Sequence, residues 1–202
     1  MLHDTMKELT EQVMRRLFVE LEASARHVHL TKEQTLRLFG HDLTPERPLS
    51  QPGQFLARER VTVVGPKGEF RNVAVLGPAR KEAQVEVSMT DARVLGLQPP
   101  IRESGNVAGS PGAVINSEKG QITIESGVII AQRHLHLTPE DAARFAVEDR
   151  QVVRLQVFTR RPLIFQDVLV RVRPDFATRA HLDFDEANAC GLQPGDLGRI
   201  LP

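Results

Sequence analysis

The stretch SARHVHL at residues 24–30 recurs as AQRHLHL at residues 131–137. Both copies contain an Arg-His-x-His-Leu core, and their first histidines are 107 positions apart, 134 minus 27. Two residues at i and i+2 point in different directions on a helix, whereas on a strand they share one face. We therefore expect each histidine pair to lie on a β-strand with both imidazoles on the same side.

The repeat extends beyond the histidines. FRNVAVLGP (70–78) matches FQDVLVRVR (165–173), and QVEVSMTDARVLGLQP (84–99) matches RAHLDFDEANACGLQP (179–194), each with a separation of 95. The first copy therefore has twelve additional residues, which we place in the loop around residues 41–55 because loops tolerate insertions best. Internal duplication of this kind predicts two similar halves related by a pseudo-twofold axis.

Short β-strands dominate the predicted secondary structure. Helices are expected at 31–39 and 138–146, where Thr is the N-cap and Pro139 occupies the first helical position of the second. Many short strands with few helices predict a mainly β fold, a barrel or a sandwich. The strand segments are rich in Val and Ile and bounded by turn residues: VTVVG, NVAVLG, QVEVSM, QITIES, GVIIAQ, QVVRLQVF and DVLVRV.

The duplication divides the chain into residues 1–20, a first domain at 21–127 and a second domain at 128–202. Residues 101–120 are rich in Gly and Ser and are interpreted as a connector. Residues 1–17 predict an amphipathic helix that either packs on the body or is presented to a partner. Its apolar positions are Leu2, Met6, Leu9, Val13 and Leu17.

Composition excludes several classes of protein. The 202 residues carry 26 acidic and 26 basic side chains and neither Trp nor Tyr, which argues against a nucleic-acid-binding surface. A single cysteine, Cys190, excludes an internal disulfide and suits a reducing cytosol. The charged N-terminal segment is unlike a secretory signal, and no run of eighteen apolar residues predicts a membrane span.

The repeat also supplies a third metal ligand for each histidine pair. Under the 95-residue separation, Glu86 aligns with His181, and both residue types bind zinc. The alternative is that Glu86 is a solvated carboxylate on a strand and His181 a histidine without a metal. His3 and His41 have no partner in the repeat and are expected at the surface. Three protein ligands with an open position are typical of catalytic zinc. The two predicted ligand sets are His27, His29 and Glu86, and His134, His136 and His181.

Two further residues have candidate roles. Arg80 precedes Glu86 by six positions, so strand alternation would place it on the same face, where a guanidinium can bind a phosphate or carboxylate in bidentate fashion. The alternative is a surface arginine. Cys190 aligns with Leu95, a core-like position, so we expect it to be buried packing and not a nucleophile.

The sequence resembles the PduL-type phosphotransacylases, zinc-dependent phosphate acyltransferases of bacterial microcompartments, also described as phosphate propanoyltransferases. The resemblance covers residues 22–202 and implies two tandem β-barrels with two zinc ions at their junction. The motifs that carry it occur in the family's order: SARHVHL, LSQPGQF, VTVVGPKG, VLGPARKEAQVEVSMTDAR, GVIIAQRHLHLTPEDA and HLDFDEANACG.

The resemblance implies the reaction of propanoyl-CoA or acetyl-CoA with phosphate to give acyl phosphate and CoA, by direct attack of zinc-bound phosphate on the thioester. It assigns the six zinc ligands named above and places the phosphate-binding, catalytic arginine at Arg80. The implied coenzyme A contacts are Ser24, Leu76, His181, Asn188 and Arg47.

The chain departs from the family at two positions near these motifs. Phe184 stands where Thr is common, and Ala74 stands where a basic residue is frequent, so both bear on CoA affinity. Family members often begin with a short helix that targets them to a microcompartment lumen, and residues 1–17 look similar. The expected location is therefore the cytoplasm, inside a microcompartment, with shell or lumen enzymes as partners.

Two other functions fit the same ligands: a dinuclear zinc hydrolase of thioesters, and a non-catalytic metal-binding microcompartment protein. Neither acyl chain length nor the choice between a monomer and a homo-oligomer can be read from the sequence.

Overall fold

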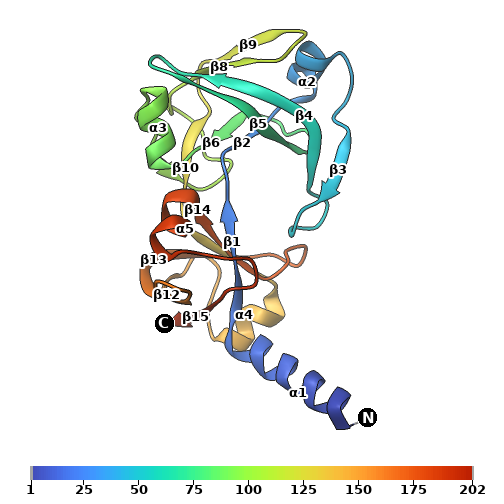
Figure 1. Ribbon diagram of the computed structural model, residues 1–202, viewed down its shortest axis with the longest axis vertical. Helices are drawn as coiled ribbons and strands as arrows, with labels where there is room; N and C mark the ends of the chain where they lie inside the picture. The colour runs from blue at the N-terminus through green and yellow to red at the C-terminus, as the bar shows by residue number, and fades with distance from the viewer. Residues whose placement is uncertain (1, 202) are drawn as a thin grey trace. The chain divides into compact units, whose positions relative to one another are not determined.

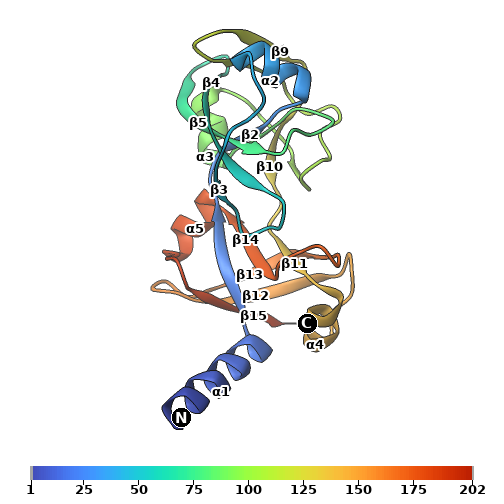
Figure 2. The same cartoon turned by 90° about the vertical axis from the view of Figure 1, so that its right-hand side faces the viewer.

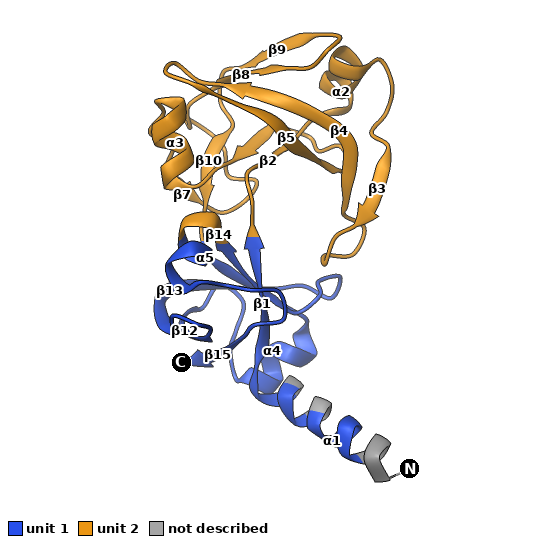
Figure 3. Cartoon of the chain, in the orientation of Figure 1, with its two compact units in different colours: residues 1–23, 133–182, 186–202 blue, residues 24–132, 183–185 orange. Residues whose placement is uncertain are grey.

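The computed structural model describes residues 2–201, including all side chains except those of residues 2–5, 11, 12 and 15. The chain forms two compact units, coloured separately in Figure 3. Unit 1 comprises residues 1–23, 133–182 and 186–202, and unit 2 comprises residues 24–132 and 183–185. These units differ from the ranges 1–20, 21–127 and 128–202 because the strand that follows the N-terminal helix pairs with strands of the C-terminal half.

Unit 1 contains a closed six-stranded barrel with the strand order β1-β14-β11-β13-β12-β15 (Figure 1). In β12, Val153, Leu155 and Val157 are buried and alternate with more exposed residues, so the period of two directs one face into the barrel core. The strands are β1 (Val19–Ser24), β11 (His134–Leu137), β12 (Val152–Phe158), β13 (Leu163–Val172), β14 (Arg179–Asp183) and β15 (Leu197–Leu201). The helices are α1 (Leu2–Leu17), α4 (Pro139–Phe145) and α5 (Phe184–Cys190), and the first two residues of α5 belong to unit 2.

Unit 2 contains a curled nine-stranded sheet in the order β7-β10-β6-β2-β5-β4-β8-β9, with β3 paired to β4. The strands are β2 (His27–His29), β3 (Pro45–Pro48), β4 (Phe55–Val64), β5 (Glu69–Gly77), β6 (Gln84–Glu86), β7 (Ile101–Arg102), β8 (Ala113–Asn116), β9 (Gln121–Ile124) and β10 (Val128–Ala131). The helices are α2 (Lys32–Phe39) and α3 (Met89–Leu95), and α2 lies beside β9 (Figure 2).

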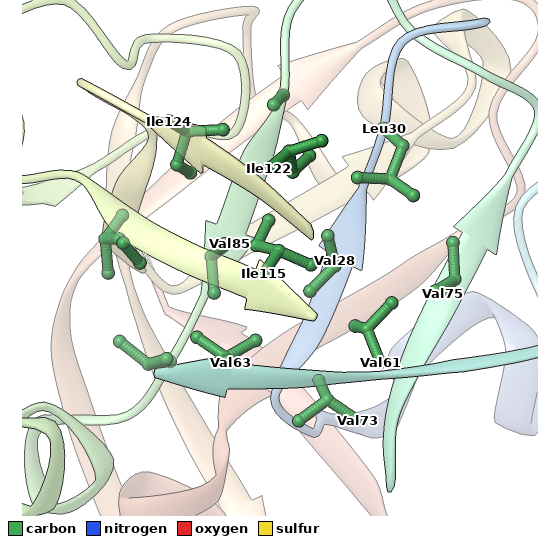
Figure 4. Packing of buried hydrophobic residues seen from close by; sticks show 14 of the residues in the cluster. Val28, Leu30, Val61, Val63, Val73, Val75, Val85, Ile115, Ile122 and Ile124 are labelled. Carbon is green, nitrogen blue, oxygen red and sulfur yellow. The ribbon is translucent and has the colours of Figure 1, made fainter. Parts of the chain in front are cut away.

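The prediction of a mainly β fold with short helices is confirmed. Its sheets differ in closure, however: the barrel closes in unit 1, whereas the curled sheet of unit 2 ends at β7 and β9. The apolar face of that sheet is filled by Val, Leu and Ile side chains, among them Val28, Val75, Val85 and Ile115, which Figure 4 shows packed together. All four are at most 1% exposed.

Strand pairing confirms the alignment of the two repeats. The first histidine of each pair lies opposite the third predicted ligand on an antiparallel neighbour, His27 opposite Glu86 and His134 opposite His181. On the other side, β2 and β11 each pair with a parallel strand, β5 or β13, again at the 95-residue separation. The duplication therefore preserves the pairing register around both predicted ligand sets.

The pairing also locates the residues that distinguish the two copies. Val61 pairs with Val73 as Val153 pairs with Val168, so β4 and β12 are equivalent at a separation of 92, 153 minus 61. The first copy thus has fifteen extra residues before β4, which include β3, as predicted for the loop around residues 41–55. The second copy has three extra residues between β12 and β13. Fifteen minus three gives the net difference of twelve, which is all that comparison of the outer motifs shows.

One organisational prediction is wrong. Residues 101–120 do not form a connector, because β7 and β8 lie within this range and pair with β10 and with β4 and β9, respectively. The Gly and Ser residues form the turns between these short strands. The segment is therefore an integral part of unit 2.

The predicted helices are confirmed. The side-chain hydroxyls of Thr31 and Thr138 accept hydrogen bonds at the starts of α2 and α4, as expected for N-caps. Helix α1 presents apolar side chains that are between 45% and 58% exposed, and Leu2 lies outside the described side chains. These exposed residues are Met6, Leu9, Val13 and Leu17. Among the described residues, no helix combines the length and apolar character needed to cross a membrane.

Candidate metal and phosphate site

The three predicted ligands of unit 2 meet on one face of the sheet. His27 and His29 come from β2 and Glu86 from the adjacent β6, and one ligand atom from each lies within 4.8 Å of the others. All three residues are at most 7% exposed. Two imidazoles and a carboxylate at this separation are a suitable ligand set for zinc.

Hydrogen bonds orient both imidazoles. His27 Nδ1 lies 2.8 Å from the carbonyl oxygen of Ala25, and His29 Nδ1 lies 3.3 Å from that of Leu76. With Nδ1–H donating to a carbonyl, the Nε2 lone pair of each ring is available to a metal, which is the usual arrangement of zinc-binding histidines. The surroundings of the cluster therefore fit a bound metal ion.

The charges of the three side chains suit the same role. Burial lowers the pKa of His29 well below its usual value, assisted by the charges of His27 and Arg80, so this ring is neutral. Burial would raise the pKa of Glu86, but the His27 charge and hydrogen bond outweigh it and hold that pKa far below its usual range. Burial likewise opposes the charged form of His27, yet the Glu86 carboxylate, 3.5 Å away, raises the pKa of His27 overall. A cation can replace the proton of His27 in this pair.

A chain of hydrogen bonds joins this cluster to Arg80. Gln84 Nε2 donates to Glu86 Oε1 at 2.5 Å and to Ser104 Oγ at 2.9 Å. Ser104 Oγ also accepts a hydrogen bond from Arg80 Nη1 at 3.0 Å. Gly105 N donates to Gln84 Oε1 at 2.6 Å, so both ends of this buried amide are bonded. The guanidinium of Arg80 is thereby fixed relative to the carboxylate of Glu86.

Arg80 reaches this position by a route other than the predicted one. It precedes β6, which begins at Gln84, so strand alternation does not apply to it. Its backbone N–H donates to the carbonyl oxygen of Leu30, the residue after the histidine pair, at 2.8 Å. A cavity of about 500 Å³ lies beside it, and Ala79, Lys81, Ala83 and Val107 contribute to the lining.

The three predicted ligands of unit 1 are also neighbours. The ring centroid of His136 lies 4.6 Å from that of His134 and 4.8 Å from that of His181. The centroids of His134 and His181 are 5.1 Å apart, and these two rings are parallel within 2°. Phe176 packs against His136 with ring centroids 4.2 Å apart. Three imidazoles from β11 and β14 therefore form the second cluster, at positions equivalent to the first.

The residues that the resemblance assigns to coenzyme A are distributed over both units. In unit 2, Ser24 and Leu76 are half-buried and Arg47 is exposed on β3. In unit 1, His181 belongs to the second histidine cluster, and Asn188 is exposed on α5. Their assignment to CoA stays a prediction.

The remaining predictions concern individual side chains. Cys190 and Leu95 are both fully buried at equivalent positions, which confirms the packing role predicted for the cysteine. His41 is exposed, as expected, and His3 lies outside the described side chains.

The sequence reasoning missed Gln84 and Ser104. Gln84 could have been found, because it lies two residues before Glu86 on a strand and so shares its face. Ser104 could not, because its segment was interpreted as a connector.

The fold and site together define a mainly β protein with a duplicated histidine cluster, one copy of which adjoins a hydrogen-bonded arginine. A protein-family model described as phosphate propanoyltransferase matches residues 20–193. The chain therefore belongs to the phosphate propanoyltransferase family and is an acyltransferase.

Relatives named phosphate propanoyltransferase are similar over almost their whole length. The protein from Enterococcus faecalis is 51% identical over 98% of both chains. That from Clostridioides difficile is 45% identical over all of this chain and 97% of its own. That from Thermotoga maritima is 54% identical over 88% of this chain and 86% of its own.

Proposed function

We propose that this protein interconverts acyl-CoA and phosphate with acyl phosphate and CoA at a dinuclear zinc site. Propanoyl-CoA and acetyl-CoA are the proposed acyl donors. His27, His29 and Glu86 would hold one ion, and His134, His136 and His181 the other. The single observation that supports this proposal most is the hydrogen-bonded connection from Glu86 through Gln84 and Ser104 to Arg80, which associates an anion-binding group with a set of metal ligands.

In the proposed reaction, an oxygen of phosphate attacks the thioester carbonyl carbon directly. The C–O bond forms, the C–S bond breaks, and the CoA thiolate leaves and takes up a proton from solvent. Arg80 binds the phosphate oxygens and offsets the negative charge that develops on the carbonyl oxygen. The described motifs contain no activated nucleophile, since Cys190 is fully buried and burial raises the pKa of its thiol.

Zinc, when bound by these residues, would supply Lewis-acid stabilisation of the phosphate and of the developing charge. Coenzyme A would contact Ser24, Leu76, His181, Asn188 and Arg47. The neutral ring of His29 and the ionised carboxylate of Glu86 support the metal assignment, because both are already in the protonation state that a ligand needs.

We further propose that α1 targets the protein to a bacterial microcompartment in the cytoplasm, where shell or lumen enzymes would be its partners. The exposed apolar stripe of Met6, Leu9, Val13 and Leu17 supports this role, since a helix packed only on its own unit would bury these side chains.

The test is release of CoA from propanoyl-CoA with and without phosphate, before and after removal of zinc by a chelator. A Cys190→Ala background removes the protein's own thiol from the colorimetric assay. We expect release that requires both phosphate and zinc, with acyl phosphate formed in equal amount. Release without phosphate would indicate a thioester hydrolase, and two bound zinc ions without any release would indicate a non-catalytic metal protein.

A further inference from the structure

The arginine that begins each Arg-His-x-His-Leu core has no part in the reaction proposed above. In unit 2 this residue is Arg26, which directly precedes His27. Its Nη2 and Nε donate to the two carboxylate oxygens of Asp91 at 2.7 and 3.1 Å. Its guanidinium carbon lies 4.2 Å from the ring centroid of Phe70. Arg26 thus forms a bidentate ion pair with Asp91 and a cation–π contact with Phe70.

Unit 1 contains a similar arrangement at equivalent positions, with one nitrogen of the arginine bonded to the acid. Arg133 directly precedes His134, and its Nη1 donates to Glu186 Oε1 at 2.7 Å. Its guanidinium carbon lies 6.0 Å from the ring centroid of Phe165. Glu186 and Phe165 follow Asp91 and Phe70 by 95 positions, the separation of the repeat. Both compact units therefore contain an arginine, an acidic residue and a phenylalanine at equivalent positions.

The acids connect the arginine to the strand that carries the third metal ligand. Asp91 is the third residue of α3, which begins three residues after Glu86, and Glu186 is the third residue of α5, which begins three residues after His181. Asp91 is held in place because its backbone and side chain form a capping box with Ser88. Each ion pair therefore links the strand of the histidine pair to the helix that follows the third ligand.

Each of these links lies at the end of a short strand ladder. β2 and β6 are three residues long, and the pair formed by His27 and Glu86 is the last one in their ladder. Ends of short ladders open first, since few hydrogen bonds hold them. The ion pair lies directly beyond this end and restrains the two strands there. His134 is likewise the first residue of β11, with Arg133 directly outside it.

We propose that Arg26 and Arg133 are positioning residues, each of which fixes a histidine relative to the third ligand so that the metal-binding geometry exists before the metal arrives. This inference rests on the proposed metal sites. The degree of burial supports a positioning role: the Asp91 side chain is 6% exposed and that of Arg26 is 35% exposed, so water screens the pair only in part. For Arg26 the bidentate geometry also fixes the direction of the pair, which a lysine at the same position would not do. Arg133 donates to Glu186 through Nη1 and to the carbonyl oxygen of Gln166 through Nε.

The test compares Arg26→Met and Arg26→Lys with the control Arg71→Met. Arg71 is an equally charged residue of unit 2 whose ion pair with Glu69 stays within β5, where both residues are exposed. Zinc affinity is measured by competition with a chromophoric chelator, and the absorption spectrum of the cobalt-substituted protein reports ligand geometry. Thermal unfolding of the zinc-free protein reports the stability of the fold.

We expect Arg26→Met to lower the affinity for one of the two zinc ions about tenfold, as loss of a residue that supports a metal ligand does. Arg26→Lys should restore the affinity in part, and Arg71→Met should leave it unchanged. The melting temperature of the zinc-free protein should fall by only about 2–4 °C. Arg133→Met should produce the same effects on the other zinc ion, and the cobalt spectrum should change in both methionine variants.

Two results would overturn the proposal. One is a zinc affinity in Arg26→Met and Arg133→Met equal to that of the unmodified protein. The other is a loss of affinity fully matched by unfolding of the zinc-free protein, with an unchanged cobalt spectrum, because the ion pair then supports only the fold. If Arg26→Met does not fold, Asp91→Asn removes the same ion pair with a side chain of equal size. Failure of the proposed metal sites is distinguishable, because the unmodified protein itself would then bind no zinc.

Discussion

The two copies of the repeat share their scaffold and differ in the groups that surround the ligands. The strand register is the same in both units, and each unit has an arginine–acid pair at equivalent positions. Glu86 of unit 2 corresponds to His181, Arg80 corresponds to Asp175, and Gln84 corresponds to Arg179. The two copies thus share the residues proposed to position the metal ligands, whereas the side chains proposed to act on a substrate differ.

The divergence changes the charge beside each cluster. In unit 2, Arg80 is bonded to Ser104, and an anionic carboxylate belongs to the ligand set. In unit 1, Asp175 pairs with Arg173 at the surface, and Arg179 pairs with Glu20, so neither is arranged as Arg80 is. An anion-binding role is therefore expected of unit 2 and not of its copy. The predictions below test this asymmetry.

The largest expected effect is the loss of a ligand from either copy. His27→Ala and His134→Ala should each remove one zinc ion and cost about 4 kcal/mol of transition-state stabilisation, roughly a thousandfold in kcat/KM. Zinc content by elemental analysis and turnover of propanoyl-CoA measure this. Should only one of the two variants lose activity, the unaffected copy would be a structural remnant. Two zinc ions in either variant would contradict the ligand assignment.

The second prediction separates Arg80 from its counterpart. Arg80→Lys keeps the charge but loses the planar guanidinium. The activation free energy should rise by about 1.5–3 kcal/mol, so kcat/KM for phosphate should fall roughly ten- to a hundredfold. The KM for acyl-CoA should change much less, and zinc should stay fully bound. Asp175→Asn is the matched control and should leave both constants unchanged. Equal impairment for both substrates would remove Arg80 from the phosphate site.

The sequence predicted which residues lie together because the repeat aligns them. The two predicted ligand sets depend on the two-residue spacing within each histidine motif and on strand register. The spacing can be read directly from the sequence, and the register follows from the alignment of the two copies. Glu86 and His181 could be found only because the copies could be aligned. Closure of a sheet depends instead on which edges meet over long distances, and for this reason the barrel of unit 1 and the open sheet of unit 2 were not distinguished.

The missed residues have the same cause. Ser104 lies 24 residues after Arg80 and 20 after Gln84, in a segment whose Gly and Ser content resembles a linker. Composition describes how freely a segment can turn, but not what its side chains reach after the turn. The arginines of the two Arg-His-x-His-Leu cores were visible from the start, yet their role depends on acids 65 and 53 positions away.

The third prediction concerns Ser104, whose hydroxyl joins Arg80 to Gln84 in unit 2. Ser104→Ala removes the acceptor of Arg80 and should cost about 1 kcal/mol, roughly a fivefold rise in the KM for phosphate. Zinc affinity should not change, because Gln84 still bonds Glu86. Ser117→Ala is the control, since its hydroxyl bonds the Leu38 carbonyl in the same unit, and phosphate KM should be unchanged. A weaker zinc site in Ser104→Ala would show that the network supports the metal and not the arginine.

The smallest catalytic effect is expected at α1, which belongs to neither copy of the repeat. Leu9 and Val13 are 54% and 45% exposed, so their replacement by Gln removes little buried apolar surface and should change stability by no more than about 0.5 kcal/mol. Phe18 anchors the end of the helix through an edge-on contact with Phe158, with ring centroids 5.4 Å apart, and this contact remains in the double variant. Turnover and both KM values should therefore stay within about twofold of the unmodified protein, a change of under 0.5 kcal/mol.

Recruitment of a fluorescent reporter fused to residues 1–17 into microcompartments should be lost when the same two substitutions are made. A zinc-loaded double variant with a tenfold lower turnover would instead show that the helix supports the catalytic body, and normal recruitment of the substituted reporter would show that the apolar stripe does not bind the partner.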